Sequence, residues 1–111
     1  MKRGDIWTTA GGAAYVGKPR PAVIVQINVL NDNLRTVLLC PISSFSSDPS
    51  FFRVAVEPTK ENGLRLPSEI MVEKLQSANR SRIGQVIGHL DDETLRKLAR
   101  SIMIALGLTD E

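Results

Sequence analysis

The stretch GKPRPAVIVQ, residues 17–26, places a single arginine between two prolines and directly before an apolar run. Proline restricts the backbone torsion φ, so Pro19 and Pro21 hold the chain around Arg20 stiffly. The residues at 22–25 are all apolar, and a short uninterrupted apolar run of this kind is typical of a buried strand. The stretch therefore predicts a core strand with a charged side chain held at its entrance.

Short apolar segments and turn-forming residues alternate on both sides of this stretch. We expect residues 22–28 and 34–40 to form an antiparallel hairpin, because LNDN at 30–33 contains Asn and Asp, which tolerate turn geometry. Serine-rich ISSFSSDPS at 42–50 is expected to be a loop, since its hydroxyls compete for backbone hydrogen bonds. The other predicted strands lie at 6–9, 51–57, 69–75 and 82–89.

A helix is predicted at 92–106, with Asp91 capping its first amides and Gly107 just past its end. Gly84 and Gly88, inside the last predicted strand, suggest bulges or tight bends. Short strands followed by one terminal helix give the fold class α+β, mainly β. We expect one strongly bent sheet or partly open barrel with the helix packed on it.

The composition limits what the chain does. Its 111 residues, formal net charge of +2 and 42% hydrophobic residues are those of a single soluble domain spanning 1–111. No apolar run approaches the roughly 20 residues that cross a bilayer, and no secretory signal opens the sequence, so we expect a cytoplasmic protein without a membrane partner. One cysteine, one histidine and no phosphate-binding glycine motif argue against a metal or cofactor.

Arg20 is the most informative candidate site residue. Its guanidinium stays charged at any relevant pH and offers a donor fork suited to phosphate or carboxylate. The stiff backbone on either side lowers the entropy lost when the side chain engages an anion. On these grounds an anion site and a structural salt bridge, for example to Asp5, remain equal alternatives.

Ser43 and Ser44 follow the second arm of the predicted hairpin, just as Arg20 precedes the first arm. Because the start of one antiparallel strand lies beside the end of its partner, we expect Arg20 and Ser43 to lie close together. An arginine and a hydroxyl at one end of a sheet can bind a phosphate. Histidine is the side-chain type that most often serves as a general acid or base, but His89 has no visible partner, which favours a structural role.

Four segments extend this pattern over nearly the whole chain: RGDIW at 3–7, GKPRPAVIV at 17–25, LLCPISS at 38–44 and LPSEIMVEKLQSANRSRIGQVIGHLDDETL at 66–95. Together, and in this order, they resemble the MazF/PemK family of toxin endoribonucleases from toxin–antitoxin modules. The resemblance implies a small SH3-like β-barrel of the CcdB/PemK type with a C-terminal helix, and a homodimer.

The resemblance also implies metal-independent, sequence-selective cleavage of single-stranded RNA, with no cofactor, and inhibition by a cognate MazE-like antitoxin. In this family the substrate's own 2′-OH attacks the adjacent phosphorus and leaves a 2′,3′-cyclic phosphate and a 5′-OH. Catalytic roles fall on Arg20 and on Ser43, which stands in place of the family's threonine. The residues expected to bind substrate are Lys18, Ser44, Gln76 and Asn79.

The chain departs from some relatives in ways that leave other functions open. Gln76 and Asn79 stand where those relatives carry an arginine and an aspartate, and neither amide exchanges protons near neutral pH. Residues 8–17 contain no ionisable side chain except Tyr15, so no general base is identified. An inactive regulatory family member and a CcdB-like gyrase poison remain alternatives, although this chain ends in ALGLTDE rather than the gyrase poisons' Trp-Gly-Ile.

Overall fold

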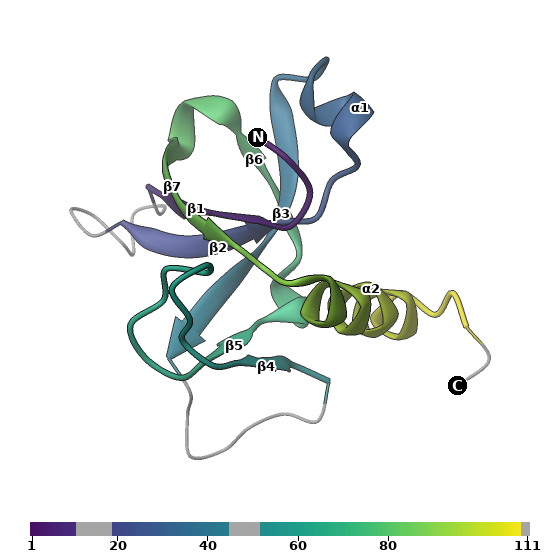
Figure 1. Ribbon diagram of the computed structural model, residues 1–111. Coiled ribbons are helices and arrows are strands. Elements are labelled where there is room, and N and C mark those ends of the chain that lie inside the picture. Colours follow the sequence, from purple (N-terminus) through teal and green to yellow (C-terminus); the bar gives the residue numbers. More distant parts are fainter. Residues whose placement is uncertain (11–18, 45–51, 110–111) are drawn as a thin grey trace.

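The computed structural model describes residues 1–10, 19–44 and 52–109 (Figure 1). The strands are β1 (Asp5–Thr9), β2 (Arg20–Ile24), β3 (Thr36–Ser44), β4 (Val54–Val56), β5 (Ser68–Ile70), β6 (Gln76–Asn79) and β7 (Ile83–His89). The helices are α1 (Asn28–Asn31) and α2 (Asp92–Ala105), with the 3₁₀ turns η2 (Val72–Lys74) and η3 (Arg80–Arg82). The expected class, mainly β with a C-terminal helix, is confirmed.

Strand β3 joins two parts of the sheet, one that contains β1, β2, β6 and β7 and one that contains β4 and β5. All strand pairs are antiparallel, in the order β4-β5-β3-β2-β1-β7, with β6 also paired to β3. Leu39 pairs with both Ile24 and Gln76, so β2 and β6 lie on opposite edges of β3. Within the described residues, the end strands β4 and β7 do not pair with each other. A closed barrel is therefore not confirmed, and the sheet is open.

Three extra residues interrupt the pairing of β5 and β6 along β3. Ile42 of β3 pairs with Ile70, and Leu39 of β3 pairs with Gln76. The two pairing positions are three residues apart on β3 but six residues apart on the segment that contains β5 and β6. The extra residues form the turn η2, which links the two short strands. The predicted strand at 69–75 was wrong, because β5 ends at Ile70 and residues 72–74 form this turn. The strand β6, which follows the turn, was not expected.

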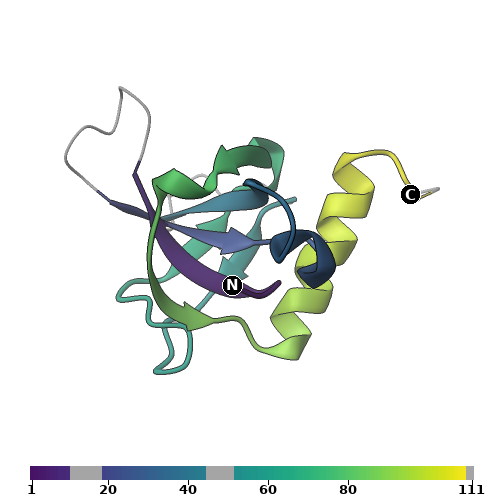
Figure 2. The same cartoon turned by 90° about the horizontal axis from the view of Figure 1, so that it is seen from above.

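The core lies mainly between the sheet and α2, which runs beside the sheet in Figure 2. Its larger cluster contains Cys40, Ile70, Val72 and Leu98, and includes residues from the helix and from both halves of the sheet. A smaller, separate cluster is formed by residues of β2 and β3, namely Ala22, Ile24, Val37 and Leu39. Alternation along β3 sends Cys40 to the first cluster and Leu39 to the second.

Two predicted connections have more regular structure than expected. Residues 28–31 form α1 instead of a turn, because Asn31 is fully buried and its side chain donates to the Gln26 carbonyl at 2.9 Å. Strand β3 continues through Ser44, since Ser43 and Ser44 pair with β5 and the backbone ladder outweighs competition from the hydroxyls. The rest of ISSFSSDPS lies outside the described residues.

The helix ends and the bulges follow the predicted pattern. Asp91 Oδ1 accepts a hydrogen bond from Thr94 N at 2.7 Å and caps α2, while Gly107 adopts a φ of 70° beyond its end. The pairing of β1 with β7 shifts register on both sides of Trp7. Gly88 permits one close approach, because an added Cβ would lie 2.3 Å from the Glu61 carbonyl oxygen.

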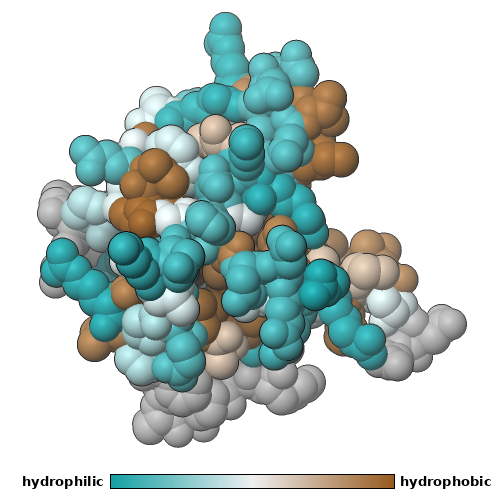
Figure 3. Space-filling view, viewed as in Figure 1, coloured by the Kyte–Doolittle hydropathy of each residue, from teal (hydrophilic) through white to brown (hydrophobic). Residues whose placement is uncertain are grey.

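Apolar side chains remain exposed around α1, where Figure 3 shows a hydrophobic area at the upper right. Ile27 and Val29 are 58% and 61% exposed, and Leu30 and Leu34 are exposed as well. No helix in the described ranges is both long enough and apolar enough to cross a bilayer.

Replacing Gly88 by alanine is expected to destabilise the fold by about 2 kcal/mol or more, since backbone of the 61–62 segment would have to move. Gly107→Ala is the matched control. It meets no atom within 4 Å and should cost only about 1 kcal/mol, for its positive φ. Urea unfolding measures both; equal losses would contradict the close-approach explanation.

Burial raises the pKa of the Cys40 thiol from 9.0 to about 12, and the Glu73 carboxylate adds to this effect. The folded state favours the neutral thiol, so its contribution to stability is complete below pH 9 and is lost as the pH rises toward 12. We expect wild type to lose about 2 kcal/mol more than Cys40→Ala between roughly pH 8 and 10.5. Parallel pH curves in urea unfolding would contradict this.

Candidate active site

A pocket of about 220 Å³ opens where β2 begins and β3 ends. Part of its wall is apolar and belongs to the smaller core cluster, through Ala22 and Leu39. Polar side chains from strands and 3₁₀ turns far apart in sequence line the rest: Thr9, Arg20, Ser43, Lys74, Gln76, Ser77, Asn79 and Arg82. The pocket therefore depends on the whole sheet rather than on one loop.

Arg20 lies at the start of β2, and Ser43 lies near the end of the neighbouring strand β3. The described ladder between these strands ends at the pair of Ala22 and Pro41, and its register, extended by two residues, would bring Arg20 opposite Ser43. On its other side Arg20 pairs with Thr9, whose hydroxyl donates to the Arg20 carbonyl at 3.2 Å. Both side chains line the pocket, as the hairpin rule predicted.

The described lining of the pocket is positively charged. Arg20, Lys74 and Arg82 contribute three cations from β2, η2 and η3, and no carboxylate lines it. Cations gathered in a small concave site attract anions more strongly than the same charges spread over a surface. The arrangement favours a ligand with several negative charges.

Gln76 and Asn79 also line the pocket, and each makes a local hydrogen bond. Gln76 Nε2 donates to the Lys74 carbonyl at 3.2 Å. Asn79 Oδ1 accepts from Ser81 N at 3.0 Å and caps the turn η3, which carries Arg82. The two amides thus help to hold the turns on which Lys74 and Arg82 lie.

The other two predicted substrate-binding residues are not among the described pocket residues. Ser44 is exposed and pairs with Ser68 one residue beyond Ser43, without lining the pocket. Lys18 lies outside the described residues.

Asp5 and His89 lie away from the pocket. They pair with each other at one end of β1, whereas Thr9 and Arg20 pair at the other end, roughly 13 Å along the strand. Asp5 and Arg20 therefore lie at opposite ends of β1, so the structure does not place the Asp5 carboxylate beside Arg20. His89 is exposed and takes no part in the described lining.

Lys74 and Arg82 were not identified from the sequence as site residues. Lys74 reaches the pocket because η2 interrupts the pairing with β3, and Arg82 because η3 follows β6. Each turn contains only three residues, so neither produces a periodic pattern of apolar residues from which the turn could be predicted. The only local signal is Asn79 two residues before Ser81, a spacing suited to a side-chain cap.

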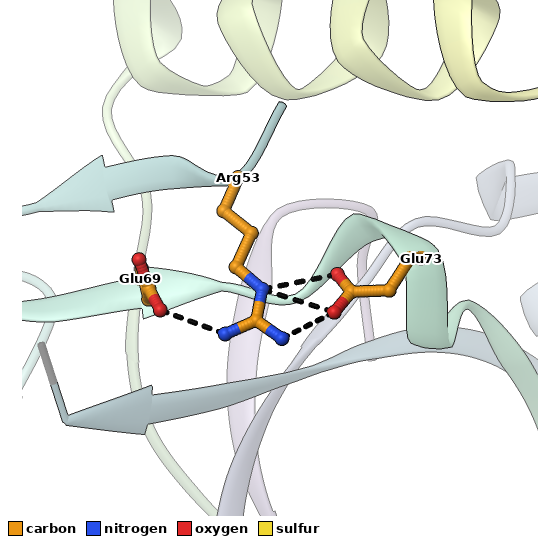
Figure 4. Close-up of polar contacts among 3 residues, drawn as sticks. All are labelled: Arg53, Glu69 and Glu73. Atoms are coloured by element: carbon orange, nitrogen blue, oxygen red, sulfur yellow. Dashed lines mark hydrogen bonds and ion pairs between the residues drawn. The ribbon is translucent and has the colours of Figure 1, made fainter. Parts of the chain in front are cut away.

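Beside the pocket, Arg53 binds two carboxylates (Figure 4). Its Nη1 donates to Glu69 Oε1 at 2.7 Å, and its Nε lies 3.1 and 3.0 Å from the two oxygens of Glu73. Nη2 also donates to Glu73 Oε2. Glu69 is only 1% exposed and pairs with Ser43 across β5 and β3, so this cluster adjoins the pocket.

The cluster favours the charged forms of Arg53 and Glu73. Hydrogen bonds from Arg53 lower the pKa of the Glu73 carboxyl, and those to Glu73 and Glu69 raise the pKa of Arg53 above its usual range. A buried carboxylate without a partner would be costly, so Arg53 is what allows Glu69 to lie inside the fold. In the described part of the chain, no three His, Cys, Asp or Glu side chains are grouped to hold a metal ion.

Comparison with known proteins identifies the same family across the chain. The family model for the PemK-like, MazF-like toxin of type II toxin–antitoxin systems matches residues 2–106. The chain is 33% identical over 108 residues to the probable endoribonuclease MazF of Mycolicibacterium smegmatis, covering 97% of this chain and 98% of that protein.

Solved structures share the fold. An endoribonuclease in complex with its cognate antitoxin, from mycobacterial species, superposes with a TM-score of 0.83 at 19% identity, over 100% of this chain and 99% of that one. The Mycobacterium tuberculosis toxin MazF-mt6 gives a TM-score of 0.79 at 26% identity, over 95% and 98% of the two chains. With its mainly antiparallel sheet and C-terminal helix, the chain belongs to the PemK-like, MazF-like toxin family of type II toxin–antitoxin systems.

Proposed function

We propose that this chain is a toxin endoribonuclease that cleaves single-stranded RNA in the pocket between β2 and β3. The observation that carries the proposal is that Arg20 and Ser43 line the same pocket, whose described lining holds three cations and no carboxylate. The family and the relatives named as endoribonucleases support it. The reaction takes place in the cytoplasm and needs no metal ion.

In the proposed reaction the 2′-OH of the substrate attacks the adjacent phosphorus, and the bond to the 5′-oxygen of the next nucleotide breaks. The products are a 2′,3′-cyclic phosphate and a 5′-OH. Negative charge builds up on the phosphoryl oxygens in the transition state, where the fork of Arg20 donates and Ser43 adds a hydroxyl donor. No described lining side chain has an ordinary pKa near neutrality, so these residues act by stabilising charge and orienting the phosphate.

Substrate-binding roles follow the same geometry. The amides of Gln76 and Asn79 line the pocket and offer hydrogen bonds to bases or sugar groups. Lys18 and Ser44 are assigned to substrate binding on the family resemblance alone, since Ser44 does not line the described pocket. These amides suit binding rather than proton transfer, which agrees with their lack of a titrating group.

The proposed partners are a cognate MazE-like antitoxin and a second copy of this chain. A structural neighbour was solved with its cognate antitoxin, and an acidic segment complements a cationic pocket. Exposed apolar residues around α1, among them Ile27 and Val29, provide a surface that a homodimer would bury.

The most direct experiment is primer extension on a long, mixed-sequence RNA incubated with the protein in EDTA, with and without antitoxin. Cleavage at defined sites that stops when antitoxin is added supports the proposal. Intact RNA across varied sequences would contradict it and favour an inactive regulatory family member.

Arg20→Ala is expected to fold normally but to lose RNA cleavage by about 100-fold or more, as removal of one transition-state donor does. The matched control is Arg65→Ala, which removes an exposed arginine that does not line the pocket. Rates are measured on a fluorogenic RNA in EDTA. Equal rates for Arg20→Ala and wild type would remove Arg20 from the mechanism.

Ser43→Ala is expected to slow cleavage by about tenfold or more, because the hydroxyl donor is lost. Ser43→Thr keeps the hydroxyl and should stay within a few-fold of wild type, and Ser101→Ala on α2 controls for loss of a hydroxyl elsewhere. If the alanine and threonine variants cleave at the same rate, the hydroxyl has no role in the reaction.

A further inference from the structure

The turn η2 carries a lysine into the pocket that the proposed mechanism does not use. We propose that Lys74 binds a phosphate of the RNA next to the phosphate held by Arg20. This inference rests on the proposed function and adds a subsite to it. Three observations support it: the shape of η2, the partner of Glu73 and the charge of the pocket.

The three residues of η2 point in three directions. A 3₁₀ turn has three residues per turn, so successive side chains are about 120° apart. Val72 is 2% exposed and packs in the larger core cluster, and Glu73 binds Arg53. The third side chain, Lys74, lines the pocket. The first two contacts hold the turn, and thereby fix where the third side chain begins.

The neighbouring carboxylate does not take up the Lys74 charge. Arg53 donates to both oxygens of Glu73, and no ion pair of Lys74 is present within the described residues. The Lys74 ammonium contributes to the lowered pKa of the Glu73 carboxyl, but less than Arg53 does. The Lys74 ammonium, on an exposed residue that lines the pocket, therefore remains available to an anionic ligand there.

The number of cations exceeds what one phosphodiester needs. A phosphodiester carries a single negative charge, whereas Arg20, Lys74 and Arg82 supply three positive charges from three segments. An RNA strand brings one further phosphate with each nucleotide, so consecutive phosphates match separated cations. Lysine serves such a contact well, since its ammonium binds phosphate as a point charge without demanding one geometry.

The test uses a random-sequence single-stranded RNA with 2′-O-methyl groups, which lacks the attacking hydroxyl and cannot be cleaved. Its affinity for wild type, Lys74→Gln and Lys74→Arg is measured by fluorescence anisotropy over a range of salt concentrations. Each phosphate contact to a single strand contributes about 0.7 to the slope of log K against log salt. Lys74→Gln should lower this slope by about 0.7 and weaken binding about fivefold at roughly 0.1 M salt.

Two control variants accompany it. Lys74→Arg keeps the charge and should keep the wild-type slope. Lys97→Gln removes a lysine on α2 whose side chain is 66% exposed and pairs with Glu93, and it should leave the slope unchanged. A Lys74→Gln slope equal to that of wild type would overturn the inference, as would an equal decrease for Lys97→Gln.

Cleavage of unmodified RNA is measured in parallel, so that the two proposals fail separately. Cleavage by wild type together with an unchanged Lys74→Gln slope rejects the subsite and leaves the nuclease. The expected slope change without any cleavage rejects the nuclease and leaves the subsite. Absence of RNA binding by wild type at low salt rejects both.

Discussion

The backbone hydrogen bonds along the two edges of β3 bring together most of the described candidate site residues. One edge pairs with β2 and brings Arg20 into the same pocket as Ser43, and the other pairs with β5 and sets Glu69 opposite Ser43. A slip of one residue on either edge would exchange core and pocket side chains, because successive residues of a strand face opposite sides. The site is thus a consequence of strand register, and it needs no direct bond between its functional groups to form.

Arg20 and Arg53 show how one residue type serves two purposes in this fold. Arg53 forms ion pairs with the carboxylates of Glu69 and Glu73, which neutralise its charge. These contacts link the start of β4 to β5 and η2. Arg20 lines a pocket whose described wall contains other cations and no acid. The acidic groups near Ser43 are therefore paired with Arg53, whereas the described lining of the pocket holds cations without an acid. This separation leaves the pocket with a positive field while the interior remains neutralised.

The parts of the fold that depend on local rules could be predicted from the sequence. Proximity of Arg20 to Ser43 followed from the geometry of one hairpin, and α2 followed from its cap and its apolar spacing. The connection at 30–33 was misjudged because burial of Asn31 is a tertiary effect that no turn propensity reveals. Lys74 and Arg82 could not be found, since their positions depend on how β5 and β6 pair with β3, between residues that are 24 to 43 positions apart in the chain.

The insertion η2 also separates two properties that usually change together. Residues within a paired strand cannot vary freely, because each one affects the ladder and the core at once. A turn that hangs between two paired segments, and is attached through Val72 and Glu73, leaves its last side chain free to differ without altering either register. An exchange at position 74 would thus alter the charge of the pocket while the pairing of the sheet stays the same.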